Sequence, residues 1–241
     1  MMKPYLNRLF SYNSIINSLE KRYNLNQLQV YESILNKNNL SISRFNSIFE
    51  FGCGSGRLIQ YLPNLSKNAK IIGCDISAAN ILTCRKKMPE AQFIINNITP
   101  PLPFQDEMFD FIYSYSVFTH LSEENHKYWL KELARLLKPG GVMLHTTHPP
   151  SILKRVEMFS PEAITAFGVP GPIEDFISNN QGYYYYMDRK DLPEYGYTLI
   201  SKEYILNHWP GFSGMKIIEY TEHAVESYPM GYHDIVLMMK S

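Results

Sequence analysis

A glycine-rich loop and an acidic residue beyond it are the part of this sequence best suited to bind a ligand. Gly52-Cys53-Gly54-Ser55-Gly56 follows a short apolar run, and Asp75 ends the next apolar run. Missing side chains let a ligand approach the backbone, and free N–H groups at the start of a following helix can hold an anion. A carboxylate at the second position can accept both hydroxyls of a ribose. The pattern predicts a site for an adenosine-type ligand.

Two residues beside the loop indicate which class of adenosine-containing ligand the site suits. The dinucleotide pattern G-x-G-x-x-G needs a further glycine where Arg57 stands. Glu50 would repel a pyrophosphate, whereas an acid there suits a cationic ligand or a hydrogen bond that shapes the loop. A nicotinamide-dependent oxidoreductase is therefore the weaker interpretation, and a tight turn without a ligand is a further alternative.

The elements that must position these residues alternate between strands and helices. Strands are expected at residues 48–51, 70–75, 92–96, 109–114 and 142–147, and helices at 57–62, from the Ser77 cap onward, and at 123–137. Such alternation predicts βαβ units and a doubly wound α/β fold with a mostly parallel sheet. Ligands bind beyond the carboxyl ends of the strands in such sheets, where the loop and Asp75 stand.

The two ends of the chain depart from this alternation. Residues 1–44 have apolar positions at helical spacing and predict two or three leading helices. After Pro150 come prolines, glycines and a tyrosine run, then a short helix at 202–208. Strands at 215–222 and 233–240 are joined by a loop too short for a crossover helix, so we expect them to pair antiparallel.

Residues 45–148 resemble the class I S-adenosylmethionine-dependent methyltransferases. The resemblance rests on an ordered series: Glu50 to Gly56, Asp75, Asn97, Leu102-Pro103-Phe104, Phe109-Asp110, Ser116 to Leu121 and Lys138-Pro139-Gly140-Gly141. It implies a Rossmann-like methyltransferase fold, a seven-stranded sheet with an antiparallel last strand. We expect one domain over residues 1–241, with a helical cap (1–44), a cofactor-binding core (45–150), an insertion shaping the acceptor site (151–213) and a final strand pair (214–241).

The resemblance also implies a cofactor, S-adenosyl-L-methionine, and a product, S-adenosyl-L-homocysteine. By this similarity the glycine loop carries the methionine part, Asp75 holds the ribose and Ile76 packs on the adenine. The family commonly has aspartate where Asn97 stands, and asparagine keeps an acceptor oxygen for the adenine amino group. The expected cofactor-binding residues are Glu50, Gly52, Cys53, Gly54, Gly56, Asp75, Ile76, Asn97, Ile98, Ser114, Tyr115 and Ser116.

Methyl transfer from a sulfonium is an in-line displacement that depends on holding donor and acceptor in line. Positioning can contribute roughly 7–11 kcal/mol, and a general base adds about 10²–10⁴-fold for a hydroxyl acceptor. His148 and His120 follow strand ends and are the candidate bases, although each could instead be structural, closing a strand or preceding a helix. His145 is expected in the core. We expect no metal site, because His145 and His148 are three residues apart on a strand and therefore face opposite ways.

A run of tyrosines stands in the stretch that follows the core. Residues 182–187 and 195–199 could form a hairpin over the active site, in which Tyr184 and Tyr186 share one face and bind the acceptor. The alternative is a strand of high β propensity that packs on the body of the protein or on another subunit.

Composition limits the partners. Lysine plus arginine (23) equals aspartate plus glutamate (23), and without a basic run we expect no nucleic-acid partner. The three cysteines show no pairing pattern, and no apolar run approaches the roughly 20 residues of a membrane span. We therefore expect a cytoplasmic enzyme, with a homodimer left open, that methylates a small-molecule acceptor. A sugar or natural product is expected, at a hydroxyl rather than an amine; the alternative is a non-catalytic regulatory protein that retains the cofactor fold.

Overall fold

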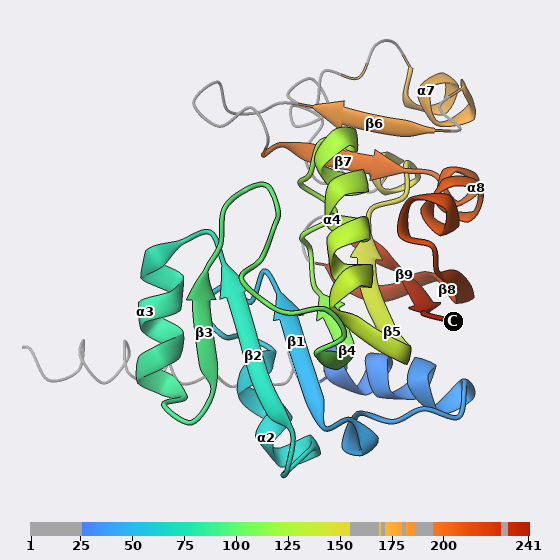
Figure 1. Cartoon of the computed structure of the whole chain (residues 1–241). Coiled ribbons are helices and arrows are strands. Elements are labelled where there is room, and N and C mark those ends of the chain that lie inside the picture. Colours follow the sequence, from blue (N-terminus) through green and yellow to red (C-terminus); the bar gives the residue numbers. More distant parts are fainter. Residues whose placement is uncertain (1–25, 155–168, 170–171, 180–181, 187–194, 228–230) are drawn as a thin grey trace, which may run out of the picture.

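The computed structural model describes residues 26–154, 169, 172–179, 182–186, 195–227 and 231–241, and a seven-stranded sheet forms its centre (Figure 1). The strands lie in the order β3-β2-β1-β4-β5-β9-β8. Their bounds are β1 Ser47–Phe51, β2 Lys70–Asp75, β3 Gln92–Ile95, β4 Phe109–Ser114, β5 Leu137–Thr147, β8 Lys216–Ser227 and β9 Gly231–Met239. Strands β1 to β5 pair in parallel, while β9 runs antiparallel to β5 and β8. The predicted fold class is confirmed.

Strand β1 lies where the strand order reverses. Its neighbours are β2 on one side and β4 on the other, and Glu50 stands opposite Gly73 and Tyr113. All five residues of β1 are buried. Because the carboxyl ends of parallel strands separate at such a reversal, a crevice opens beyond Phe51, Asp75 and Ser114.

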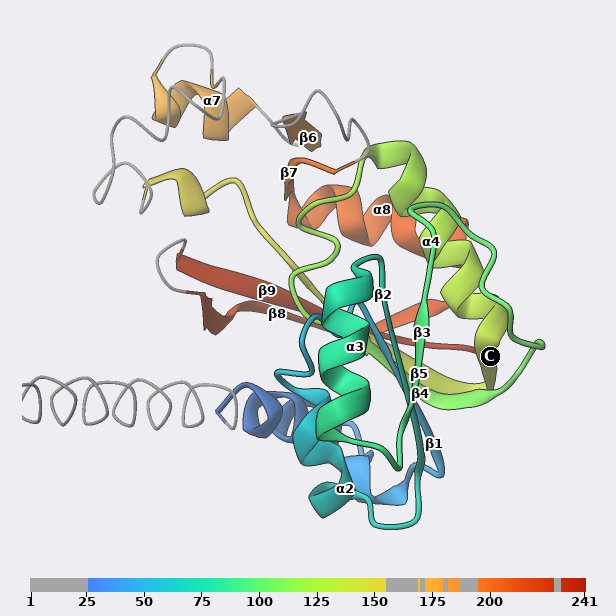
Figure 2. The ribbon, with the colours of Figure 1, turned by 90° about the vertical axis from the view of Figure 1, so that its left-hand side faces the viewer.

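Helices cover both faces of the sheet (Figures 1 and 2). The helix at residues 26–37 and α3 (Ala78–Lys87) bury apolar side chains on one face, and α4 (Glu123–Leu136) and α8 (Lys202–Ser213) do so on the other. The expected Ser77 cap is present, because its side chain accepts from the backbone N–H of Asn80. Within the described ranges, no helix is long and apolar enough to cross a bilayer.

Two predicted helices differ from the structure. The helix expected at residues 57–62 is wrong: the chain forms turns, a 3₁₀ segment (Ile59–Tyr61) and the four-residue α2 (Leu62–Leu65). Gly54 and Gly56 have positive φ and turn the chain there, so no long helix begins at the loop. Helix α8 continues past the expected end to Ser213 with Pro210 inside it, and left-handed Gly214 ends it.

A second, two-stranded sheet lies beyond the carboxyl ends of the main strands (Figure 1). Strands β6 (Tyr183–Tyr186) and β7 (Tyr197–Ile200) pair antiparallel, as the tyrosine run predicts. With the short helix α7 (Ile173–Asn179) and with Ile152 and Leu153, residues of these strands form a small apolar cluster. Of the leading helices, the one at 26–37 and a 3₁₀ turn (Ile42–Arg44) are described, and residues 1–25 lie outside the described part. The division of residues 1–241 into four parts stays a prediction.

Candidate active site

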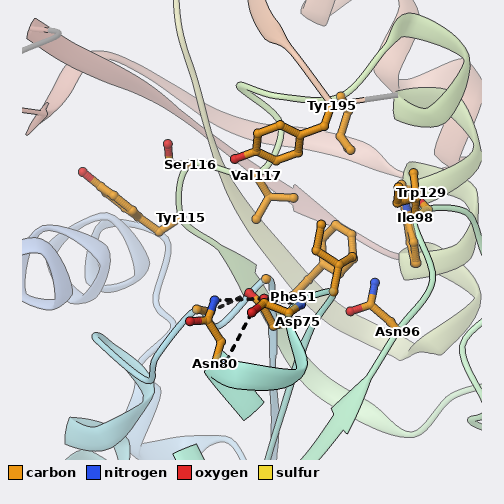
Figure 3. A pocket seen from close by; sticks show the side chains of 15 residues that line it. Phe51, Asp75, Asn80, Asn96, Ile98, Tyr115, Ser116, Val117, Trp129 and Tyr195 are labelled. Atoms are coloured by element: carbon orange, nitrogen blue, oxygen red, sulfur yellow. Dashed lines mark hydrogen bonds between the residues drawn. The ribbon is translucent and has the colours of Figure 1, made fainter. Parts of the chain in front are cut away.

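A cavity of about 440 Å³ opens where the carboxyl ends of β1, β2 and β4 separate (Figure 3). Three loops contribute most of its wall: the glycine loop after β1, the turn after β2 and the turn after β4. The lining residues are Phe51, Gly52, Gly54, Asp75, Ile76, Ser77, Asn80, Asn96, Ile98, Tyr115, Ser116, Val117, Leu121, Trp129 and Tyr195. We call this space the main cavity.

The glycine loop exposes its backbone to the main cavity. A Cβ atom at Gly52 would lie 2.3 Å from Cγ2 of Val117, so this position cannot carry a side chain without displacing its neighbour. Gly54, with φ of 54°, would place a Cβ into open space. The amide of Cys53 donates to the carbonyl of Cys74 (2.8 Å), which ties the loop to β2. A ligand can therefore approach a backbone that is already fixed.

The carboxylate of Asp75 organises the turn that follows β2. Its Oδ2 accepts from the amide of Gly54 (2.8 Å), and its Oδ1 accepts from the amide of Ser77 (2.8 Å) and from Nδ2 of Asn80 (3.1 Å), as Figure 3 shows in part. A carboxylate offers about four acceptor positions. Asp75 is thus held in place and keeps capacity for a ligand hydroxyl.

Glu50 lies below the glycine loop at a second cavity of about 310 Å³. The residue is 2% exposed, and within the described part of the chain its Oε2 has no hydrogen-bond partner. Burial raises the pKa of its carboxyl to about 8, although Tyr113 and Arg57 act in the opposite direction. A buried carboxyl whose pKa is raised by burial, and which has one unpartnered oxygen, is suited to an arriving cation.

The wall beside β3 differs from the prediction in one residue. Asn96 lines the main cavity, and its buried Oδ1 has no partner among the residues described, whereas Asn97 is exposed. Ile98 lines the cavity as expected, and its carbonyl accepts from Nε1 of Trp129 (2.7 Å). Trp129 in turn packs on Phe51, with ring centroids 4.4 Å apart.

Nine of the twelve expected cofactor residues line one of the two cavities: Glu50, Gly52, Cys53, Gly54, Asp75, Ile76, Ile98, Tyr115 and Ser116. The others are Asn97, Gly56 and Ser114. Gly56 faces Cys84 and Met88, and Ser114 is buried with its Oγ 2.8 Å from Nδ1 of His145. These placements do not test the roles of the residues, which stay predictions.

Several lining residues were missed from the sequence. Asn80 follows the Ser77 cap by one turn, so helix geometry at the cap could have indicated it. Val117 and Leu121 belong to the motif that carried the resemblance, which indicated the segment but not the side chains that face inward. Trp129 packs on Phe51 and also lines the cavity. Tyr195 belongs to the stretch that was expected to form a hairpin over the active site, but the tyrosines predicted to bind the acceptor were Tyr184 and Tyr186.

The candidate bases do not line either cavity in the described structure. Nδ1 of His120 lies 2.7 Å from the carbonyl oxygen of Gly196, and its ring stacks on Tyr195 (4.6 Å, 8°). His148 is 5% exposed and stacks on His233 (4.3 Å, 12°). Burial lowers the pKa of both His120 and His148, so both rings are neutral at pH 7. His145 is fully buried, as expected.

The tyrosines of β6 also lie away from the main cavity. Tyr184 packs edge-on against Phe176 (4.9 Å), and neither Tyr184 nor Tyr186 is among the described lining residues. Tyr195, just before β7, lines the cavity instead. The structure therefore brings the second sheet to the site through a different residue from the two predicted.

Metal and thiol chemistry find no support in the described ranges. No group of three or more histidine, cysteine or acidic side chains there could hold a metal ion. Cys53, Cys74 and Cys84 are free and buried, and burial raises the pKa of each thiol.

Comparison with known proteins agrees with this geometry. A family described as a methyltransferase domain matches residues 49–145. The uncharacterized methyltransferase YdaC of Bacillus subtilis is 30% identical over 132 residues, which cover 54% of this chain and 69% of YdaC. Trans-aconitate 2-methyltransferase of Variovorax paradoxus is 31% identical over 40% of this chain and 36% of its own length. A tRNA (carboxymethyluridine(34)-5-O)-methyltransferase of Arabidopsis thaliana is 37% identical over 41% of this chain, but only 23% of its own length is matched.

Solved structures share the fold at low sequence identity. Magnesium protoporphyrin IX methyltransferase from Synechocystis, with bound S-adenosylhomocysteine, has a TM-score of 0.59 and 16% identity over 92% of this chain and 86% of its own. An S-adenosylmethionine-dependent methyltransferase from Mesorhizobium loti has a TM-score of 0.58 and 15% identity over 83% of this chain and 92% of its own. Glycine loop, Asp75, buried Glu50 and these relatives agree: the chain belongs to the class I S-adenosylmethionine-dependent methyltransferases.

Proposed function

We propose that this enzyme transfers the methyl group of S-adenosylmethionine to a hydroxyl of a small, uncharged acceptor. The character of the main cavity carries this proposal: among its described lining residues, Asp75 is the only charged one. Asp75 already accepts three hydrogen bonds at the cofactor end. Among the described lining residues, none near Val117, Leu121 and Tyr195 would give a countercharge to a protonated amine or a phosphate group, whereas a neutral hydroxyl needs none.

The residues around the two cavities fit the cofactor. We propose that the backbone at Gly52 and Gly54 meets the methionine part and that Glu50 faces its ammonium group. Asp75 would accept the ribose hydroxyls, Ile76 and Ile98 would contact the adenine, and Oδ1 of Asn96 would accept from the adenine amino group. When bound, the cofactor supplies an electrophilic methyl group.

The chain's own contribution to transfer is positioning. The fixed glycine loop and Asp75 would hold one reactant, and the apolar wall of Val117, Leu121 and Tyr195 would hold the other and exclude water. His120 and His148 do not reach the wall, so neither is proposed as the base.

The relatives leave the acceptor open. The matched stretch lies within residues 49–145 for the domain family and is a minor part of the trans-aconitate and tRNA enzymes. Fatty-acid O-methyltransferase of Mycolicibacterium smegmatis is 31% identical over 43% of this chain. Such similarity supports methyl transfer and is compatible with an oxygen acceptor, while the zero net charge disfavours tRNA.

The test compares hydroxyl acceptors with an amine of matched skeleton and with tRNA. Purified protein and S-adenosylmethionine are incubated separately with benzyl alcohol, benzylamine, simple phenols and total tRNA. The formation of S-adenosylhomocysteine is measured in each case. We expect product with one or more of the hydroxyl compounds and none with benzylamine or tRNA. Faster transfer to the amine or to tRNA would overturn the proposal. Asp75→Ala, which should lose the cofactor, is the control for contaminating activity.

A further inference from the structure

Tyr195 has a special position in the main cavity. It is the one described residue of the stretch between β5 and β8 that lines this space, and the other lining residues all lie between Phe51 and Trp129. In Figure 3 its ring lies across from Val117, and its hydroxyl points toward the side on which Ser116 and Tyr115 lie. Tyr195 therefore faces the place where an acceptor must meet the cofactor site.

His120 and its neighbours fix the orientation of Tyr195. Tyr195 forms a backbone bridge with Leu121, and the amide of Gly196 donates to the carbonyl of His120 (2.9 Å). Because a carbonyl oxygen only accepts, Nδ1 of His120 carries the proton in its 2.7 Å contact with Gly196. The imidazole lies parallel to the Tyr195 ring at 4.6 Å. The tyrosine is thus held by its backbone and by a ring behind it.

Strand β6 of the second sheet packs closely on the segment that carries Tyr195 and Gly196. A Cβ atom at Gly196 would lie 2.2 Å from the carbonyl oxygen of Tyr186 and 2.9 Å from the ring of Tyr185. Only a glycine lets β6 approach so closely. The position of Tyr195 consequently depends on β6 as well as on His120.

The chemistry of this wall favours one class of acceptor. An aromatic side chain held flat by a parallel ring is a surface on which a planar ring stacks well. Among the described lining residues there is no histidine, and the one charged group is Asp75 at the cofactor end, so this described wall offers an acceptor hydroxyl no positioned base. A phenol, with a pKa near 10, loses its proton far more readily than an aliphatic alcohol.

We propose that Tyr195 is the residue on which a planar aromatic acceptor of the phenol class stacks, and that His120 is a positioning residue that holds Tyr195. The hydroxyl of that acceptor is the methyl-accepting group, so this inference rests on the proposed function. It also gives His120 a role that needs no proton transfer.

The experiment uses two probes of one carbon skeleton, flat 2-naphthol and saturated decahydro-2-naphthol. Binding of each to the protein saturated with S-adenosylhomocysteine is measured by calorimetry or ligand-observed NMR. We expect 2-naphthol to bind more tightly, and Tyr195→Leu to lower this preference roughly threefold to tenfold. Tyr195→Phe should retain the preference. His120→Ala should lower it, and His120→Phe, which keeps a flat ring behind Tyr195, should restore most of it.

Affinity for S-adenosylhomocysteine is measured for each variant and should stay near the wild-type value, and the melting temperature is measured to show that each variant is folded at the assay temperature. A preference that survives Tyr195→Leu in a folded, cofactor-binding variant would overturn the inference. Methyl transfer is scored separately. If the preference for 2-naphthol depends on Tyr195 but 2-naphthol is not methylated, the stacking role is supported. The proposal that a phenol hydroxyl accepts the methyl group is then wrong. Transfer to aliphatic alcohols with no dependence on Tyr195 would keep the proposed function and remove the stacking role.

Discussion

The cofactor end and the acceptor end of the main cavity are built in different ways. At the cofactor end, Asp75 receives donors from residues two and five positions later and from the adjacent glycine loop. At the acceptor end, Tyr195 is held by His120 and by strand β6, which are distant from one another in the sequence. Contacts within one βαβ unit fix the proposed cofactor end, and contacts between distant parts of the chain fix the end that we propose selects the acceptor. A variant at one end should therefore leave the other end intact.

Removal of the Asp75 carboxylate should have the largest effect. Asp75→Ala deletes the acceptor for Gly54, Ser77 and Asn80 as well as the proposed ribose contact, so we expect S-adenosylhomocysteine affinity to fall at least about 100-fold. Calorimetric titration measures this. The matched control is Asp110→Asn at the opposite end of the sheet, where Asp110 accepts from Ser47 and Lys138. Equal losses in both variants would show that the effect is general destabilisation.

Glu50→Gln should have an intermediate effect that depends on pH. In the free protein the carboxyl has a pKa of about 8 and is mostly protonated at pH 7, and it must ionise to pair with an ammonium group. Wild-type affinity for S-adenosylhomocysteine should therefore rise between pH 6 and pH 8. The variant should bind roughly tenfold more weakly at pH 8 and lose this pH dependence. A wild-type affinity that is flat over this range would contradict the role of Glu50.

The same substitution should act on stability in the opposite sense. The folded-state pKa of about 8 exceeds the ordinary value of 4.5, so folding favours the protonated carboxyl, and this contribution is lost as pH rises from 4.5 to 8. Glutamine does not ionise. Glu50→Gln should be more stable than wild type near pH 7, by up to about 3 kcal/mol. Urea unfolding at pH 5 and pH 7 measures the change, and a gain that is no larger at pH 7 would exclude this cause.

Substitutions of the two asparagines after β3 should have the smallest effect on cofactor affinity, and they distinguish which of the two side chains contacts the cofactor. Asn96→Ala removes an acceptor oxygen that lines the cavity, and we expect a twofold to tenfold loss of S-adenosylhomocysteine affinity. Asn97→Ala, at the exposed neighbour, should change it by less than about twofold. The reverse order would show that the position inferred from the resemblance is the correct one.

Most of the fold and of the cofactor end could be predicted because their signals are local. Apolar runs marked the strands, and the turn chemistry of Gly52 and Gly54 with the acid at Asp75 marked the site. The cavity is lined by Asn96, one residue before the predicted Asn97, since a strand end seen only in sequence does not show which side chain turns inward. The missing helix after Gly56 has a similar origin, because apolar residues at 58–62 suit a helix and also suit the buried turn that forms.

The acceptor end could not be predicted to the same degree. Tyr184 and Tyr186 share a strand face, as expected. On that face Tyr184 packs on Phe176, and neither tyrosine is among the described residues that line the cavity. Which of several tyrosines reaches the site depends on where β6 and β7 lie against the loop at His120, and no pattern within the segment records that contact. The histidines illustrate the same point, because their place in sequence near strand ends did not reveal that His148 stacks on His233.

The location of Trp129 gives the unlabelled protein an optical reporter of one end of the cavity. The chain has two tryptophans. Trp129 lines the cavity beside Phe51 and Ile98, while Trp209 is buried against Phe118 and His126. Indole emission should therefore change when the cofactor site fills, so cofactor binding can be followed without a dye, with the buried Trp209 as a constant background.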